Sequence, residues 1–153
     1  MKDRKRKTFI FRGFGFPIKL VNVPMRKMAG EWVIDVDFDQ LQLAALCCLL
    51  EKPAPMNGDE LKFIRKYLEM TTTEFGRIFG VSHVAVLKWE KGTRANLSTD
   101  VYIHLYMYDH LEKIKDKNFR HFFQKTRLDT LAKNMGERAY PIVIDAFEER
   151  KSA

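Results

Sequence analysis

The sequence predicts a mainly α-helical protein: a five-helix domain with a small β element on its N-terminal side and extra helices at the C-terminus. Two observations lead to this fold class. From residue 57 onward, apolar residues recur at intervals of three and four, the period of an amphipathic helix. Residues 8–38 are instead rich in aromatic and β-branched residues that alternate at a period of two. We therefore expect a basic tail at 1–7, a β-rich segment plus a helix at 8–52, the helical domain at 57–112 and a helical extension at 113–153.

The β-rich segment is expected to hold two or three short strands. Glycine-containing turns are predicted at Gly13-Phe14-Gly15 and near Ala29-Gly30. Between them, apolar residues fall close to every second position. The residues that carry this alternation are Phe9, Phe11, Ile18, Leu20, Val23, Trp32, Ile34 and Val36.

The helices are delimited by capping residues. Asp39 is the expected N-cap of the first, which runs through Lys52 and ends at Pro53 and Pro55. The expected starts of the next four are Asn57 or Gly58, Thr71 or Thr72, Ser82, and Ser98, with ends near Glu69, Gly80, Glu90 and Leu111. Two further helices are expected at about 118–131 and 141–150.

Composition and charge limit the classes of protein. The longest apolar run, residues 43–50, is too short to cross a bilayer, and the basic N-terminus has no apolar segment of a secretory signal after it. We therefore expect a cytoplasmic protein. The net charge is +7, and residues 1–7 hold five basic residues and one acidic residue. Such a tail is either a solvated terminus or a sequence-independent contact to phosphates.

Residues 72–90 satisfy the physical demands of two short helices that cross at a tight turn. Gly80 stands where the turn needs a positive φ, and Gly76 stands where the second helix must pass closely. Ser82 can cap that helix. The positions expected to be buried, so that the pair is locked, are Phe75, Phe79, Val81, Val86 and Trp89.

The opposite face of the second helix is predicted to be a DNA-reading surface. His83 can donate to or accept from base edges, Val84 can contact a thymine methyl group, and Lys88 suits a phosphate or a guanine. Thr72 is placed to bind a phosphate at the start of the preceding helix. The full set of predicted DNA-binding residues is Thr72, Ser82, His83, Val84, Leu87, Lys88, Lys91, Thr93 and Arg94.

The run from Met70 to Gly92, with Phe75-Gly76, Phe79-Gly80-Val81-Ser82, Val86 and Trp89-Glu90-Lys91, resembles the Cro/Xre helix-turn-helix family. That family usually has Ala where this chain has Gly76 and often has Leu where it has Phe. The resemblance implies an Xre-type fold over about residues 57–94. It also implies sequence-specific binding of double-stranded operator DNA by a homodimeric transcriptional regulator.

The segment before this motif is similar to antitoxin regulators of the MqsA/HigA kind. The similarity lies in Phe11-Arg12-Gly13-Phe14-Gly15-Phe16-Pro17, Leu20-Val21-Asn22-Val23-Pro24-Met25 and Gly30-Glu31-Trp32. It implies a repressor of its own operon that sequesters a toxin, usually an mRNA interferase. The paired C-x-x-C motifs of the MqsA zinc finger are missing here, so no metal module is implied.

Other chemistries find little support in the residue pattern. Cys47 and Cys48 are adjacent, which suits neither a disulfide framework nor a zinc site, and they are expected to be small apolar residues of a helix. Residues 35–39 resemble the start of a calcium loop but lack its Gly and Glu, and the four histidines share no ligand spacing. Because no nucleophile, base and acid set stands out, we expect neither an enzyme nor a cofactor.

Two alternatives to the antitoxin interpretation stay open. One is an Xre-type repressor that has no toxin. The other is a protein-interaction module in which the N-terminal strands bind a partner and DNA binding is secondary. Aromatic residues on more than one face of the last helices also predict a dimer interface: Tyr102, Tyr106, Tyr108, Phe119, Phe122 and Phe123.

Overall fold

The computed structural model describes residues 4–52, 54–111 and 142–146. The chain forms two compact units, residues 1–48 together with 139–153, and residues 49–138. In the described parts, the first unit is built on a β-sheet and the second on α-helices. The helix predicted at about 118–131 and the three phenylalanines at 119–123 lie outside the described residues.

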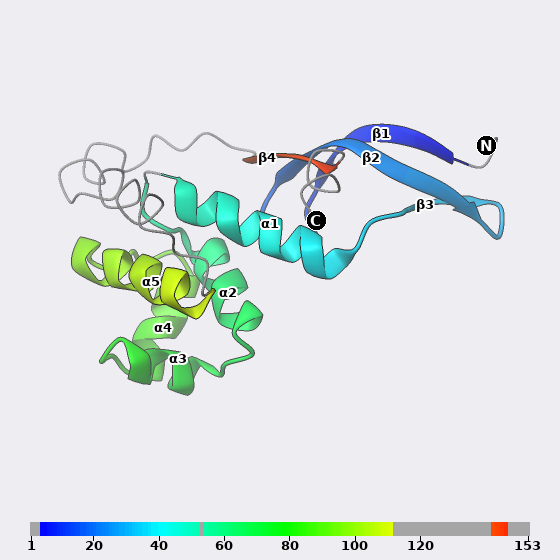
Figure 1. The fold of residues 1–153 in the computed structure, drawn as a ribbon. Coiled ribbons are helices and arrows are strands. Elements are labelled where there is room, and N and C mark those ends of the chain that lie inside the picture. The colour runs from blue at the N-terminus through cyan, green and yellow to red at the C-terminus, as the bar shows by residue number, and fades with distance from the viewer. Residues whose placement is uncertain (1–3, 53, 112–141, 147–153) are drawn as a thin grey trace. The chain divides into compact units, whose positions relative to one another are not determined.

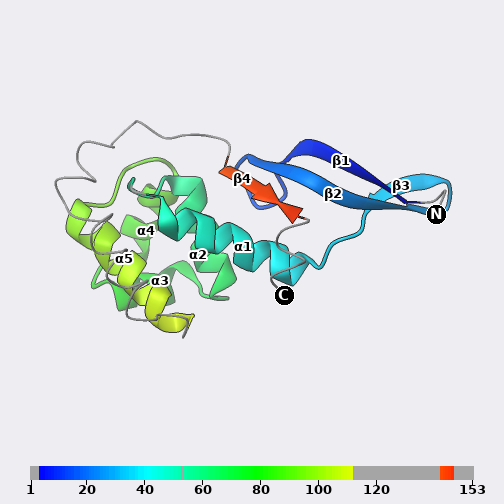
Figure 2. The same cartoon turned by 45° about the horizontal axis from the view of Figure 1, so that its top comes forward.

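The first unit is organised around one long strand, β2 (Ile18–Met28). β1 (Arg4–Phe11) pairs with it antiparallel along one edge. The other edge is shared, because β4 (Ile142–Asp145) runs parallel to the first half of β2 and β3 (Glu31–Ile34) runs antiparallel to its last residues. Figures 1 and 2 show β4 and β3 beside opposite ends of β2.

This mixed four-stranded sheet overturns the expectation of a mainly α fold with a small β element. The sheet forms the framework of one entire unit in the described residues. The helix predicted at 141–150 is wrong over Ile142–Asp145, which form β4. The reason is tertiary: Ile142 and Ile144 are buried beside Ile18 and Leu20 of β2, whereas Val143 is exposed.

The predicted basic tail is also shorter than expected. Residues 4–7 form the first half of β1 and pair with Val23–Arg26 of β2. Basic side chains are compatible with a strand at a sheet edge, because their charged ends reach water. Four of the residues assigned to a terminal tail therefore have a fixed register in the sheet.

A bulge in β2 keeps its apolar side chains on one face. Lys7 lies opposite Val23 but Phe9 lies opposite Leu20, so two residues of β2 face one residue of β1. Asn22 takes up the extra residue with a φ of 55°, a conformation that Asn tolerates better than most residues. Because of this shift, Val23 continues the buried face that Ile18 and Leu20 begin.

The turn between β2 and β3 has two residues, as the Ala29-Gly30 pair predicted. Met28 pairs with Glu31, and both Ala29 (φ 51°) and Gly30 (φ 84°) have positive φ. Positive φ at both central positions is the type I′ geometry, whose twist matches that of the flanking strands. Gly30 adopts it freely, whereas Ala29 does so at a steric cost.

Helix α1 (Phe38–Glu51) starts in this unit and is capped by Asp37 rather than by the predicted Asp39. The Asp37 carboxylate accepts from the backbone N–H of Asp39 at 2.9 Å and of Gln40 at 3.4 Å. Asp35 instead approaches Arg26 at 3.8 Å. The acidic run therefore ends a strand and begins a helix, as expected, and Cys47 and Cys48 lie half-buried in α1.

The described part of the second unit contains helices α2 (Gly58–Tyr67), α3 (Thr72–Ile78), α4 (His83–Glu90) and α5 (Leu97–His110), close to the predicted bounds. The N-cap of α5 is Asn96, whose side chain accepts from Thr99 N–H, and not the predicted Ser98. The core of these helices includes Leu61, Ile64, Phe75, Val86, Ile103 and Met107.

A buried polar pair fastens the entry to α2 onto α5. The Asp100 carboxylate accepts from the backbone N–H of Met56 at 2.8 Å and lies 3.4 Å from His104 Nδ1. His104 is fully buried, and its Nδ1 also lies 2.8 Å from the Asp100 carbonyl oxygen. His104 therefore packs in the core of the second unit, with its Nδ1 against the carbonyl oxygen one turn earlier in α5.

Candidate nucleic-acid interface

Helix α3 is set by its capping box. The Thr71 hydroxyl accepts from Glu74 N–H at 3.1 Å, and the Glu74 carboxylate accepts from Thr71 N–H at 2.9 Å. Of the two predicted starts, Thr71 is therefore the cap. Thr72, a predicted phosphate contact, is the half-buried first residue of the helix.

The turn between α3 and α4 depends on two glycines. Gly80 has a φ of 69°, in the left-handed region that the sequence predicted for it. A Cβ atom on Gly76 would lie 2.6 Å from the carbonyl oxygen of Val81. In addition, Val81 N–H donates to the Gly76 carbonyl at 2.9 Å. The chain entering α4 is therefore held directly against the backbone of α3.

The far end of α4 is held in the same manner by a residue that the sequence did not single out. A Cβ atom on Gly58, the first residue of α2, would lie 2.5 Å from the Glu90 carbonyl oxygen and 2.6 Å from that of Trp89. Only glycine permits this approach. The available signal was a glycine at a helical position, where alanine favours the helix by about 1 kcal/mol.

An ion pair adds a second attachment at this end. Arg65 Nε of α2 lies 2.7 Å from Glu90 Oε1, and the two side chains are 15% and 8% exposed. The same guanidinium donates through Nη1 to the Met70 carbonyl at 2.9 Å, just before α3. Arg65 therefore ties α2, α4 and the entry to α3 together, a role that sequence patterning did not reveal.

The predicted reading surface lies on the exposed side of α4. Val84 and Leu87 are 47% and 39% exposed, which is unusual for apolar side chains in a small folded unit. Ser82, whose hydroxyl accepts from Ala85 N–H at 3.3 Å, caps the helix as predicted. Eight of the predicted DNA-binding residues are exposed on α4 or directly beside its ends, and are named here the α4 strip: Ser82, His83, Val84, Leu87, Lys88, Lys91, Thr93 and Arg94.

Burial of the opposite side agrees with the prediction in part. Phe75, Val86 and Trp89 are buried, at 1%, 1% and 8% exposure. Phe79 and Val81, which were also expected to be buried, are only half-buried. Phe79 instead takes part in a surface aromatic cluster, with its ring centroid 5.5 Å from Tyr102 and 5.8 Å from Tyr106.

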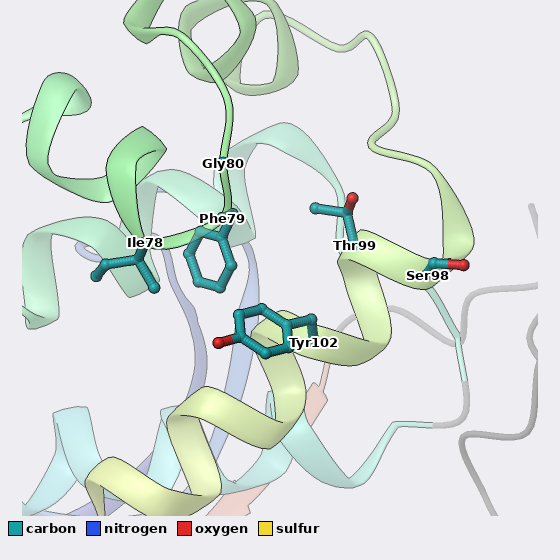
Figure 3. Close-up of a pocket in the computed structure, with 6 residues that line it drawn as sticks. All are labelled: Ile78, Phe79, Gly80, Ser98, Thr99 and Tyr102. Carbon is teal, nitrogen blue, oxygen red and sulfur yellow. The ribbon is translucent and has the colours of Figure 1, made fainter.

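A pocket of about 280 Å³ lies next to this cluster. As Figure 3 shows, it is lined by Ile78, Phe79 and Gly80 at the end of α3 and by Ser98, Thr99 and Tyr102 on α5. The lining contains hydroxyls but no carboxylate, imidazole, thiol or amine. Its volume is at the lower limit for small-molecule sites, so it is a weaker candidate than the α4 strip.

Within the described ranges, no group of three or more His, Cys, Asp or Glu side chains could hold a metal ion. No described helix combines the length and apolar character needed to cross a membrane. The chain matches no protein-family model, no curated protein and no solved structure.

Proposed function

We propose that this protein is a sequence-specific DNA-binding transcriptional regulator that reads double-stranded DNA with α4. The observation that carries the proposal is the manner in which α4 is mounted. Backbone contacts at Gly76 and Gly58 fix its two ends, while the α4 strip remains exposed along its length. A short helix that is fixed at both ends and exposed on one face suits insertion into a major groove.

The chemistry of the α4 strip fits the edges and walls of that groove. His83 and Lys88 offer polar contacts to bases and phosphates, and the exposed methyl groups of Val84 fit a thymine methyl. Lys91 and Arg94 follow at the helix end, where cations suit the phosphate backbone. Thr93 is positioned there by a 3.0 Å hydrogen bond from its N–H to the Lys88 carbonyl.

The regulator acts as a homodimer in this proposal, since two reading helices about one DNA turn apart bind a palindromic operator. Tyr102 is 50% exposed on the second unit, and exposed aromatic side chains are enriched at protein interfaces. Analytical ultracentrifugation at micromolar concentration checks this step. A monomer that persists both free and on operator DNA would contradict it.

The direct test is a mobility shift with the DNA upstream of the protein's own gene, at two salt concentrations and against scrambled competitor. Binding that survives competitor supports the proposal. His83→Ala and Lys88→Ala should each weaken operator binding by about 5-fold to 150-fold, the range for loss of a base or phosphate contact of about 1–3 kcal/mol. The matched control is Lys62→Ala, an exposed lysine of α2 that is not part of the strip. Equal affinities for operator and scrambled DNA would overturn the proposal.

The setting that we propose for this regulator is an autoregulating antitoxin. Its support is the resemblance of residues 11–32 to antitoxin regulators, together with the finding that these residues lie in a separate β-sheet unit. That unit can bind a toxin while α4 binds DNA. Co-purification of a neighbouring gene product, lost when the first unit is disrupted but retained in Lys88→Ala, tests this setting.

A second candidate function, partner binding without specific DNA recognition, has its own supporting observation. β1 lies at the edge of the described sheet and is eight residues long, which is enough to pair with a strand of another chain. Proline substitution at Ile10, an exposed position in this strand, would block such pairing. Loss of a partner together with unchanged DNA binding in Ile10→Pro would favour this candidate.

A further inference from the structure

The strands β1 to β3 of the first unit are strongly basic. Residues 4–35 contain eight basic and two acidic residues. Five of the basic side chains lie on the first half of β1 and on the end of β2 that leads to the β2–β3 turn. This surface, named here the basic ribbon, consists of Lys5, Arg6, Lys7, Arg26 and Lys27.

The strand register distributes these side chains over both faces. Lys5, Lys7 and Lys27 lie on the face that also carries the buried Val23 and Met25, because Lys5 is opposite Met25, Lys7 is opposite Val23, and Lys27 follows at the next alternate position. Arg6 and Arg26 lie on the other face. All five residues are exposed. The Lys5 ammonium is held 4.2 Å from the centre of the Trp32 ring, which fixes one positive charge across the ribbon.

Protection of the sheet edge does not explain this distribution. Lysines on an edge strand discourage unwanted pairing, which accounts for the charges of β1. However, this end of β2 lies between β1 and β3, so it is not an edge of the sheet. Arg26 and Lys27 nevertheless stand on it, and the described acid nearest to Arg26 is Asp35, at 3.8 Å. Edge protection therefore does not account for the charges on β2, and their presence points to a ligand.

We propose that the basic ribbon binds the phosphate backbone of duplex DNA, as a second and sequence-independent contact besides the α4 strip. Residues 26–31 at the tip of the ribbon are exposed on both faces, which suits a groove, where phosphates lie on two sides, whereas a membrane surface needs only one basic face. The major groove, about 12 Å wide, admits a β-ribbon. Alternate residues on a strand advance about 6.7 Å, close to two base-pair rises of about 3.4 Å. This inference rests on the proposed function in one respect, that the ligand is DNA.

The test measures binding of the full-length protein to a random-sequence duplex of 25 base pairs by fluorescence anisotropy between 50 and 200 mM KCl. In the variant Lys7→Gln/Lys27→Gln, we expect the slope of log affinity against log salt to fall by about 1.8, because each lost phosphate contact removes about 0.9. Affinity at 0.1 M salt should fall about 10-fold or more, equally for operator and random DNA. Lys7→Arg/Lys27→Arg should retain wild-type binding.

The matched control is Lys62→Gln/Lys66→Gln, which removes the same charge from exposed positions of α2. Its slope should change by less than about 0.5, since these two lysines belong to neither the basic ribbon nor the α4 strip. Equal slopes in the ribbon variant and this control would overturn the inference. Wild-type binding to phosphatidylserine vesicles without binding to duplex would do so too.

The two proposals fail separately. If the protein prefers its operator but the ribbon variant keeps the wild-type salt slope, only the basic ribbon is refuted. If the ribbon variant loses slope but the wild-type protein does not discriminate operator from random DNA, the ribbon stands and specific reading by α4 is refuted. Unchanged circular dichroism and melting temperature in the ribbon variant show that a loss of binding is not a loss of fold.

Discussion

At the scale of single residues, the position of α4 depends on two glycines, Gly58 and Gly76, whose lack of a side chain lets other backbone atoms approach closely. At Gly58, a Cβ atom would lie within 2.6 Å of two carbonyl oxygens at the end of α4. We expect Gly58→Ala to destabilise the protein by about 1–3 kcal/mol, the usual range for overpacking, despite the better helix propensity of Ala. Thermal unfolding measures this effect, with Asp59→Ala at the next, exposed position as the control. A higher melting temperature for Gly58→Ala would contradict the close contact.

Ala29 is the opposite case, because another residue type would suit its backbone conformation better. Its φ of 51° places an L side chain in the left-handed region, at a cost of about 1–2 kcal/mol relative to glycine. Asn-Gly is the preferred pair for this type I′ turn. We therefore expect Ala29→Asn to raise the free energy of unfolding by about 0.5–1 kcal/mol and Ala29→Val to lower it. Chemical denaturation of both variants tests this order of stability. Equal denaturation midpoints for the two variants would refute the turn geometry.

A residue's role could be predicted from sequence only where its contact partners lie close to it along the chain. Gly76, Gly80 and Ser82 act on atoms within six residues, so the motif at 72–90 indicated all three roles. Gly58 meets carbonyl oxygens more than 30 residues away, and no local pattern reveals such a contact. The α4 strip was predictable for the same reason, because its exposure follows from helical spacing within one motif.

At the scale of elements, Arg65 and Glu90 join two helices through a largely buried ion pair. Removal of one partner leaves the other charge buried without compensation, which costs about 3–5 kcal/mol for fully buried pairs. The partial exposure of Arg65 reduces that figure, so we expect Arg65→Met to destabilise the protein by about 2–3 kcal/mol. Glu90→Gln, which retains a hydrogen-bond acceptor, should cost less. A double-mutant cycle by urea unfolding measures the coupling, and a coupling near zero would show that the pair does not fasten α4.

The strands show where local pattern stops being informative. The three β-branched residues at 142–144 also fit a short apolar helix, and the partner that makes them a strand is residues 18–20, more than 120 positions earlier. The bulge at Asn22 depends equally on distance, since its side chain donates to Asp145 at 3.1 Å. The alternation of apolar residues predicted strands at 8–38. Their pairing with β4, which completes the mixed sheet, depends on residues that are remote in sequence.

That bulge gives an element-scale prediction. Asn22→Val places a β-branched residue at a φ of 55° and removes the bond to Asp145. We expect a loss of about 2–3 kcal/mol, from backbone strain of about 1–2 kcal/mol and one hydrogen bond of about 1 kcal/mol. Asn22→Gly relieves the strain and loses only the bond, so it should be milder. Circular dichroism melts rank the two, and an equal or reversed order would argue against the bulge.

At the scale of the whole molecule, the two proposed DNA contacts lie in different compact units. Residues 4–35 of the first unit hold eight basic and two acidic residues, while the α4 strip presents mixed polar and apolar side chains. Phosphate contacts supply affinity without sequence information, and base-edge contacts supply specificity. A chain with both surfaces can gain general affinity for DNA from one unit and discrimination from the other.

This division predicts how variants combine. The basic ribbon and the α4 strip belong to different compact units and share no side chain, and effects of such independent sites add to within about 0.5 kcal/mol. In Lys7→Gln/Lys27→Gln/Lys88→Ala, the loss of operator affinity should therefore equal the product of the fold-losses of the ribbon variant and of Lys88→Ala. Random DNA should show a smaller effect of Lys88→Ala than operator DNA does. A combined loss no larger than that of the ribbon variant alone would mean that α4 binds only after the ribbon has engaged, so that the two surfaces act as one coupled site.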